Sequence, residues 1–231
     1  MLKDNELYTL KYDWILFDAD ETLFHFNSEL AIKHMFKRLS LQYCDLEYNE
    51  YHELNQQLWI KYQNQQINIQ DIKEQRFANW SKKFNLPTSK LNHEFLNSMA
   101  EISDVLPGCY ETLKSLYGKF KIGIITNGMR DLQEARLLKT DCKKYIDLLV
   151  ISEEVGVAKP HTEIFEFAHS KMYYPSKTRV LMVGDNPDSD ILGGQNFGFD
   201  TCWYNPNKKP IPNSINPTFI ITHLTDILEI V

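Results

Sequence analysis

The chain reads Ile15-Leu16-Phe17-Asp18-Ala19-Asp20-Glu21-Thr22-Leu23 near its start, and this stretch decides the fold. An apolar run rich in β-formers stops at two aspartates, which predicts a buried strand with acids at its C-terminal end. In open α/β sheets, ligands bind at that end of the strands. Neighbouring carboxylates oppose each other's ionisation, and a divalent cation such as Mg²⁺ relieves the repulsion. The alternative is an ordinary strand that ends in a polar turn.

After Pro107-Gly108 the chain alternates between apolar strands and amphipathic helices. We expect strands at 120–126, 148–152, 179–183, 201–204 and 218–221. We expect helices at 110–117, with Leu113, Leu116 and Tyr117 inward, at 130–139, 163–172 and 188–197, and at the end of the chain. Such alternation predicts a Rossmann-like α/β fold, a parallel sheet with helices on both faces. The first strand needs this sheet for its neighbours, so both ends of the chain belong to it.

Residues 24–104 contain no convincing strand and show helical spacing of their apolar residues. Ser28 is expected to cap the first helix of this segment. Further helices are expected at 49–62, 70–84 and 88–101. The sequence therefore predicts a core domain of residues 1–23 and 105–231, with an all-helical cap domain of residues 24–104 inserted after the acids.

Composition narrows the class of protein. A net charge of −6 argues against binding to a nucleic acid polymer or an anionic membrane. No apolar run approaches the ~20 residues that span a bilayer, and Met1 to Tyr12 lacks the apolar core of a signal peptide. The four cysteines form no C-x-x-C pair and are expected to be reduced. We expect a cytoplasmic protein, as a monomer or a weak homodimer.

Reactive residues also gather near the ends of the later strands. Thr126-Asn127-Gly128 follows one strand, Lys159-Pro160 precedes a helix, and Gly184 to Asp190 brings further acids after another strand. Each group alone has an ordinary interpretation, respectively a turn, a solvated surface lysine, and acids favoured in the first turn of a helix. Together they indicate a single site.

On these residues the chain resembles the haloacid-dehalogenase superfamily of phosphotransferases, in the order and spacing of its motifs and in the position of the helical cap. The four motifs correspond to Asp18-x-Asp20-x-Thr22, Thr126, Lys159 and Gly184-Asp185-x-x-x-x-Asp190. The resemblance implies that Asp18 is a nucleophile that forms an aspartyl-phosphate. It implies that Asp20 is the general acid and then the general base.

The same resemblance implies a metal site and a phosphate site. The implied ligands of Mg²⁺, or of Mn²⁺ or Co²⁺ as substitutes, are Asp18, the backbone carbonyl of Asp20, Asp185 and Asp190. The implied phosphate-binding groups are Thr126, the Asn127 amide, Gly128 and Lys159. Dehalogenases of this superfamily lack an acid two residues after the nucleophile, so the presence of Asp20 favours phosphoryl transfer.

A closer resemblance is to the bacterial pyrimidine 5'-nucleotidases of the superfamily. It rests on Asp13-Trp14, Phe17 to Phe24, Leu58-Trp59-x-x-Tyr62-Gln63, Ile122 to Gly128 and Val150 to Pro160. This resemblance implies a nucleoside monophosphate, preferably a pyrimidine one, as the substrate.

Several readings of the cap and of the function stay open. Trp59 and Tyr62 are candidates for stacking on a base, whereas the helical spacing of Phe77 and Trp80 favours the interior of the cap. The rival functions within the superfamily are a sugar-phosphate phosphatase, a phosphoglucomutase and a phosphatase of broad specificity. The rival of a different class is a non-catalytic, metal-dependent binding or regulatory module.

Overall fold

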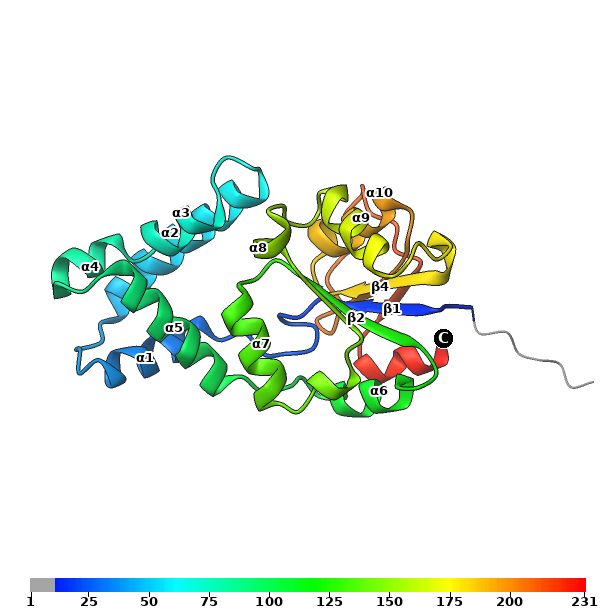
Figure 1. Cartoon of the computed structure of the whole chain (residues 1–231), viewed down its shortest axis with the longest axis horizontal. Helices are drawn as coiled ribbons and strands as arrows, with labels where there is room; N and C mark the ends of the chain where they lie inside the picture. The colour runs from blue at the N-terminus through cyan, green and yellow to red at the C-terminus, as the bar shows by residue number, and fades with distance from the viewer. Residues whose placement is uncertain (1–10) are drawn as a thin grey trace, which may run out of the picture.

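The computed structural model describes residues 11–231, and its centre is a six-stranded sheet whose neighbouring strands are all parallel (Figure 1). The strand order is β3-β2-β1-β4-β5-β6. The strands are β1 (Trp14–Phe17), β2 (Lys121–Thr126), β3 (Leu148–Ile151), β4 (Val180–Gly184), β5 (Asp200–Tyr204) and β6 (Phe219–Ile221). After β1, the chain adds β2 and β3 on one side of that strand and then β4, β5 and β6 on the other side. The C-terminal ends of β1 and β4 therefore flank a switch point, where ligands bind in such sheets.

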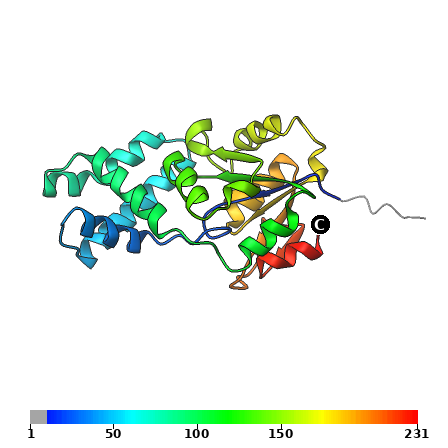
Figure 2. The ribbon, with the colours of Figure 1, turned by 60° about the horizontal axis from the view of Figure 1, so that its bottom comes forward.

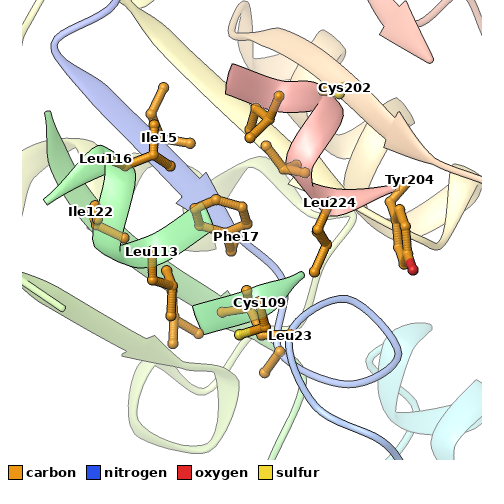
Figure 3. Packing of buried hydrophobic residues seen from close by; sticks show 14 of the residues in the cluster. Ile15, Phe17, Leu23, Cys109, Leu113, Leu116, Ile122, Cys202, Tyr204 and Leu224 are labelled. Atoms are coloured by element: carbon orange, nitrogen blue, oxygen red, sulfur yellow. The ribbon is translucent and has the colours of Figure 1, made fainter. Parts of the chain in front are cut away.

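Helices cover both faces of the sheet. They are α6 (Cys109–Leu116), α7 (Arg130–Lys139), α9 (Thr162–Lys171), α10 (Gly193–Phe197) and the 3₁₀ helix η4 (Leu224–Glu229). Ile15 and Phe17 face one buried cluster together with residues of α6 and η4 (Figure 3), and Leu16 faces another together with residues of α9. Figures 1 and 2 show α6 on one side of the sheet and α9 and α10 on the other. The predicted α/β fold is confirmed.

Short helices occupy the connections between these elements. They are η1 (Lys143–Tyr145), α8 (Ser152–Val155), η2 (Lys177–Arg179) and the π-helical η3 (Pro187–Leu192). The four cysteines are free thiols, as expected, and three of them are buried. Within residues 11–231, none of the helices combines the length and the apolar character needed to cross a membrane.

The segment between β1 and α6 is helical and lies to one side of the sheet (Figures 1 and 2). Its helices are α1 (Ser28–Arg38), α2 (Asp45–Gln63), α3 (Ile69–Gln75), α4 (Ala78–Phe84) and α5 (Thr88–Ile102). They share a buried cluster that includes Phe77 and Trp80, as the helical spacing of these two residues predicted. Met129, Leu132 and Ala158 join this cluster from outside the helical segment.

The chain enters and leaves the helical segment at adjacent points. The backbone N–H of His25 donates to the carbonyl oxygen of Asp104 at 3.0 Å, and that of Leu106 donates to Leu23 at 2.9 Å. The predicted boundaries, with the cap at residues 24–104, lie at this crossing and stay a prediction. Residues 1–10 of the predicted core domain lie outside the described residues.

One predicted helix, over 70–84, is wrong as a single element. The structure has α3 and α4 with Arg76 and Phe77 between them, and both of these side chains are buried. Successive side chains of a straight helix point about 100° apart. The interruption allows both side chains to reach the interior.

Smaller corrections concern the ends of helices. Asn27 caps α1, not Ser28, because the Asn27 side chain accepts the Leu30 N–H at 2.9 Å. Tyr117 was expected to point inward but is 57% exposed, since it follows the end of α6 and leads into a turn at Gly118. The helix predicted at 188–197 begins as the π-helical η3, and the last helix is 3₁₀.

The close approach of α10 to the loop at Lys159-Pro160 generates a stability prediction. A Cβ at Gly193 would lie 2.7 Å from the Phe165 ring and 3.0 Å from the Cα of Pro160. We expect Gly193→Ala to lower the free energy of unfolding by about 1–3 kcal/mol, because overpacking forces this backbone apart. Urea unfolding measures it. A Cβ at Gly123 would lie 2.7 Å from the end of the Leu16 side chain and 3.5 Å from Leu148, so only a side-chain end has to move. Gly123→Ala should therefore cost less than Gly193→Ala, and the reverse order would contradict the prediction.

Candidate active site

The C-terminal ends of β1, β2 and β4 meet at one cleft of about 240 Å³. The residues predicted from the strand ends line it together, namely Asp18, Asp20, Thr126, Asn127, Lys159, Asp185 and Asp190. Gly128 lines an adjoining, larger cavity, to which Asp20 and Asn127 also contribute. The strand ends therefore gather acids, a hydroxyl group and an ammonium group, as expected.

Lys159 lies at the centre of this group and is only 1% exposed, so it is not a surface lysine. Its Nζ donates to Asp18 Oδ1 at 2.5 Å and to the Ile125 carbonyl at 2.6 Å, and it lies 2.8 Å from Asp190 Oδ1. Burial alone would lower the pKa of Lys159, but the charges of Asp18 and Asp190 raise it above its ordinary value. The lysine is therefore a permanent cation between two carboxylates.

The carboxylates outnumber this cation. Asp18, Asp185 and Asp190 each offer an oxygen atom, and these atoms all lie within 4.8 Å of one another. Burial raises the pKa of Asp18 against the opposing effect of Lys159, and the charge of Asp190 raises it further. Burial and the charge of Asp190 raise the pKa of Asp185 to about 7. A crowded set of hard oxygen ligands with excess negative charge fits Mg²⁺.

Hydrogen bonds and close packing hold Asp185 and Asp190, the acids of the loop after β4, in the cleft. Asp190 Oδ2 accepts the Asn186 N–H at 3.1 Å, and a Cβ at Gly184 would lie 2.2 Å from that oxygen. Only glycine allows this approach. Thr22, from the first motif, accepts the Asp185 N–H on its hydroxyl at 3.0 Å. The motif threonine thus joins the end of β1 to the acidic loop.

Asn127 holds the lysine loop in place. Its side-chain Oδ1 accepts the Lys159 N–H at 2.7 Å, and its Nδ2 donates to the Lys159 carbonyl at 2.8 Å. The side chain of Asn127 is thereby engaged with the protein. The proposed phosphate contact through the Asn127 amide stays a prediction. Gly128 is needed for space, because a Cβ there would lie 2.3 Å from Gln133 Nε2.

Asp20 has a partner that the sequence interpretation missed. Arg136 on α7 is fully buried, and its Nη1 donates to Asp20 Oδ1 at 2.6 Å. Its Nε donates to Gln133 Oε1 at 2.9 Å, and Gln133 Nε2 lies 3.3 Å from the Thr126 hydroxyl. A signal was present, since Gln133 and Arg136 share the face of α7 that also buries Leu132 and Leu137. Buried charged residues on such a face are rare unless paired.

Trp59 and Tyr62, the two candidates for stacking on a base, lie in different cavities. Trp59 lines the adjoining cavity of about 700 Å³ between the helical segment and the sheet. Tyr62 is buried, packs edge-on against Trp59 with ring centroids 5.7 Å apart, and lines a separate cavity beside Gln66 and Gly156. The structure brings Trp59 to the cavity that contains Asp20 and does not bring Tyr62 there.

The sheet and this set of strand-end residues define a Rossmann-like α/β protein with an acidic cleft at the ends of its parallel strands. Comparison with known proteins specifies the family. Residues 15–204 match the haloacid dehalogenase-like hydrolase family, to which the chain belongs. The chain is 45% identical to the pyrimidine 5'-nucleotidase YjjG of Escherichia coli (strain K12), over 96% of this chain and 98% of that protein. It is 28% identical to the pyrimidine 5'-nucleotidase PynA of Streptococcus pneumoniae, over 94% of each.

Among solved structures, the HAD-hydrolase YfnB of Bacillus subtilis bound to magnesium is similar, with a TM-score of 0.81 and 27% identity. The match covers 96% of this chain and 99% of that one. The expected resemblance to the superfamily and to its pyrimidine nucleotidases is thereby confirmed, and the chain is a hydrolase.

The pKa values of the acids predict how stability depends on pH and metal. Because the pKa values of Asp18 and Asp185 are raised, we expect the metal-free folded protein to keep protons on these groups to a higher pH than the unfolded chain, which releases them near pH 4. The free energy of unfolding should therefore fall as the pH rises from about 4 to about 7. Mg²⁺ binds the ionised carboxylates, so it should stabilise the protein more at pH 8 than at pH 5.

Thermal unfolding at both pH values, with EDTA or with Mg²⁺, measures this effect. Asp185→Asn should reduce both the pH dependence and the stabilisation by Mg²⁺. An equal effect of Mg²⁺ at pH 5 and pH 8 would contradict the prediction.

Proposed function

We propose that this protein is a Mg²⁺-dependent phosphomonoesterase that hydrolyses nucleoside 5'-monophosphates, with a preference for pyrimidines, through an aspartyl-phosphate intermediate. The observation that carries the proposal is the meeting of Asp18, Lys159 and the acids Asp185 and Asp190 in one cleft. The identity of 45% to a pyrimidine 5'-nucleotidase supports the choice of substrate.

In the first step, an oxygen of Asp18 attacks phosphorus, and the bond from phosphorus to the 5'-oxygen breaks. Asp20 gives its proton to the departing alkoxide. In the second step, Asp20 takes a proton from water, the water oxygen attacks phosphorus, and inorganic phosphate leaves with Asp18 restored. An ionised carboxylate needs no base to activate it. Lys159 favours the ionised form of Asp18 against the burial that raises its pKa, and bound Mg²⁺ would favour that form further.

The charge of the transferring phosphoryl group is the main obstacle, and fixed cations offset it. Lys159 Nζ is already within 2.5 Å of Asp18 and supplies one charge. Mg²⁺ would be held by Asp18, the backbone carbonyl of Asp20 and Asp185, with Asp190 positioning the site, and it would supply further positive charge. Mn²⁺ or Co²⁺ would substitute. Thr126, the Asn127 amide and Gly128 would bind phosphate oxygens.

The cavity of about 700 Å³ beside the cleft would receive the nucleoside. Its volume lies in the range of small-molecule sites. Trp59 on its wall offers a ring face for stacking on a base. The cap of residues 24–104 would close this side from water. We further propose that the protein acts in the cytoplasm, as a monomer or a weak homodimer, on small phosphate esters.

Phosphate release from the purified protein tests the proposal. The panel contains uridine, thymidine, cytidine and adenosine 5'-monophosphates, sugar phosphates and p-nitrophenyl phosphate, each with Mg²⁺. We expect pyrimidine nucleotides to lead, and Asp18→Asn or EDTA to abolish turnover. If sugar phosphates were hydrolysed fastest, the proposed substrate would be wrong and the proposed reaction mechanism would stand. Activity that survives Asp18→Asn would disprove the chemistry, and no turnover on any ester would favour the binding module.

The contact between Arg136 and Asp20 generates a prediction about the leaving group. A nucleoside alkoxide needs a proton when it departs, whereas p-nitrophenolate does not. We expect Asp20→Asn to slow the first turnover of a nucleotide by about 10²–10⁴-fold, with a much smaller effect on the first-turnover release of p-nitrophenolate. Arg136→Met, which frees Asp20 from its partner, should show the same selectivity with a smaller loss.

Arg130→Met is the matched control, because Arg130 is an exposed arginine on the same helix. It should behave like the unaltered protein. An equal loss on both substrates in Asp20→Asn would show that Asp20 does not protonate the leaving group.

A further inference from the structure

Three lysine or arginine side chains are buried among residues 11–231, and two of them are paired with carboxylates. Lys159 contacts Asp18, and Arg136 contacts Asp20. The third, Arg76, is only 4% exposed, and within the described residues no carboxylate oxygen lies within ion-pair distance of its guanidinium. Because an unpaired buried cation is costly, Arg76 calls for an explanation.

The surroundings of Arg76 hold the guanidinium in a fixed position without neutralising it. Its Cζ lies 5.0 Å from the ring centroid of Phe77 and 4.8 Å from that of Phe95. Its Nη2 donates to Asn92 Oδ1 and lies 3.5 Å from Met129 Sδ. Its Nε makes no hydrogen bond of normal geometry among the described residues, and the neighbouring Tyr51 hydroxyl is likewise left without one. The group is thus anchored, charged and short of acceptors.

Arg76 also lies where the leaving group of a phosphate ester would lie. It lines the 700 Å³ cavity together with Trp59, Asp20 and Asn127. Its neighbour Met129 follows directly on Thr126-Asn127-Gly128, the loop proposed to bind phosphate. A substrate with its phosphate on that loop and the rest of the molecule in the cavity would pass along the guanidinium.

We propose that Arg76 is a specificity-determining residue that donates a hydrogen bond to a ring carbonyl oxygen of the pyrimidine base. The inference rests on the proposed nucleotidase function. A guanidinium has only donors, so its partner in the cavity must be an acceptor. Uracil, thymine and cytosine all carry a ring carbonyl, whereas adenine has none. A second group in the cavity, Asn55 Oδ1, is buried with no hydrogen-bond partner in the described part of the chain and can take part in holding the base edge.

Two variants test the proposal. Arg76→Met removes the donors but keeps an unbranched side chain between the two rings, and Arg76→Lys keeps the charge but loses the planar fork. The measurement is kcat/KM with Mg²⁺ for uridine 5'-monophosphate and for ribose 5-phosphate, which lacks the base. We expect Arg76→Met to lower the value for the nucleotide by about 10- to 100-fold and the value for ribose 5-phosphate by less than about threefold. For Arg76→Lys, kcat/KM for uridine 5'-monophosphate should lie between the values for Arg76→Met and for the unaltered protein.

Arg38→Met serves as the matched control. Arg38 is a cap arginine in exposed ion pairs with Glu94 and Glu101 and does not line the cavity. It should leave both values unchanged. If thermal unfolding shows that Arg76→Met does not fold, the two kcat/KM values of Arg76→Lys are compared with those of the unaltered protein instead. A loss confined to the nucleotide then supports the proposal.

The outcomes separate this inference from the proposed function. An equal loss on the nucleotide and on ribose 5-phosphate would show that Arg76 is only structural. Unchanged values in both variants would show that the base is bound elsewhere. Should the unaltered protein hydrolyse ribose 5-phosphate but no nucleotide, the proposed function fails first, and the role of Arg76 fails with it.

Discussion

The structure depends on the ammonium group of Lys159 between Asp18 and Asp190. Parallel strands bring the acids at their C-terminal ends together, and such a gathering is unfavourable in a buried place. A single buried cation offsets part of this cost, and its position is fixed by the Ile125 carbonyl and by the Asn127 side chain. The ends of three strands are thereby tied to one charge. The remaining excess of negative charge is what makes the cleft suitable for a second, diffusible cation.

Helix α7 connects this charge cluster to the wall of the larger cavity. Leu137 packs in the core cluster and Leu132 in the cluster of the helical segment, so the helix belongs to both. Between them, Gln133 and Arg136 reach Thr126 and Asp20. The side chains of Asp20 and Thr126, the proposed proton donor and the proposed phosphate ligand, are therefore both held by one helix. If the helical segment moved and displaced α7, the positions of both side chains would change.

The sheet and the strand-end residues could be predicted because each depends on local sequence. Continuous apolar runs specify buried strands, and the parallel arrangement then places Asp18, Lys159 and Asp185 together. The partners of these residues depend on tertiary packing, which the sequence does not display. Arg136 was missed because a charged residue in an amphipathic helix is ordinarily on the exposed face. The interruption at Arg76-Phe77 was missed because neither glycine nor proline marks it, and because two adjacent buried side chains conflict with the helical period only once the interior is known.

The pairing of His25 with Asp104 and of Leu23 with Leu106 has a consequence for how this architecture diversifies. The chain leaves the sheet and returns to it at neighbouring points, so whatever lies between can change in length without displacing β1 or α6. The helical segment can therefore be exchanged as a unit. A different insert joined at the same two backbone contacts would present a new wall to an unchanged cleft at the strand ends. Selection for a new leaving group could then proceed without altering the residues proposed to carry out the chemistry.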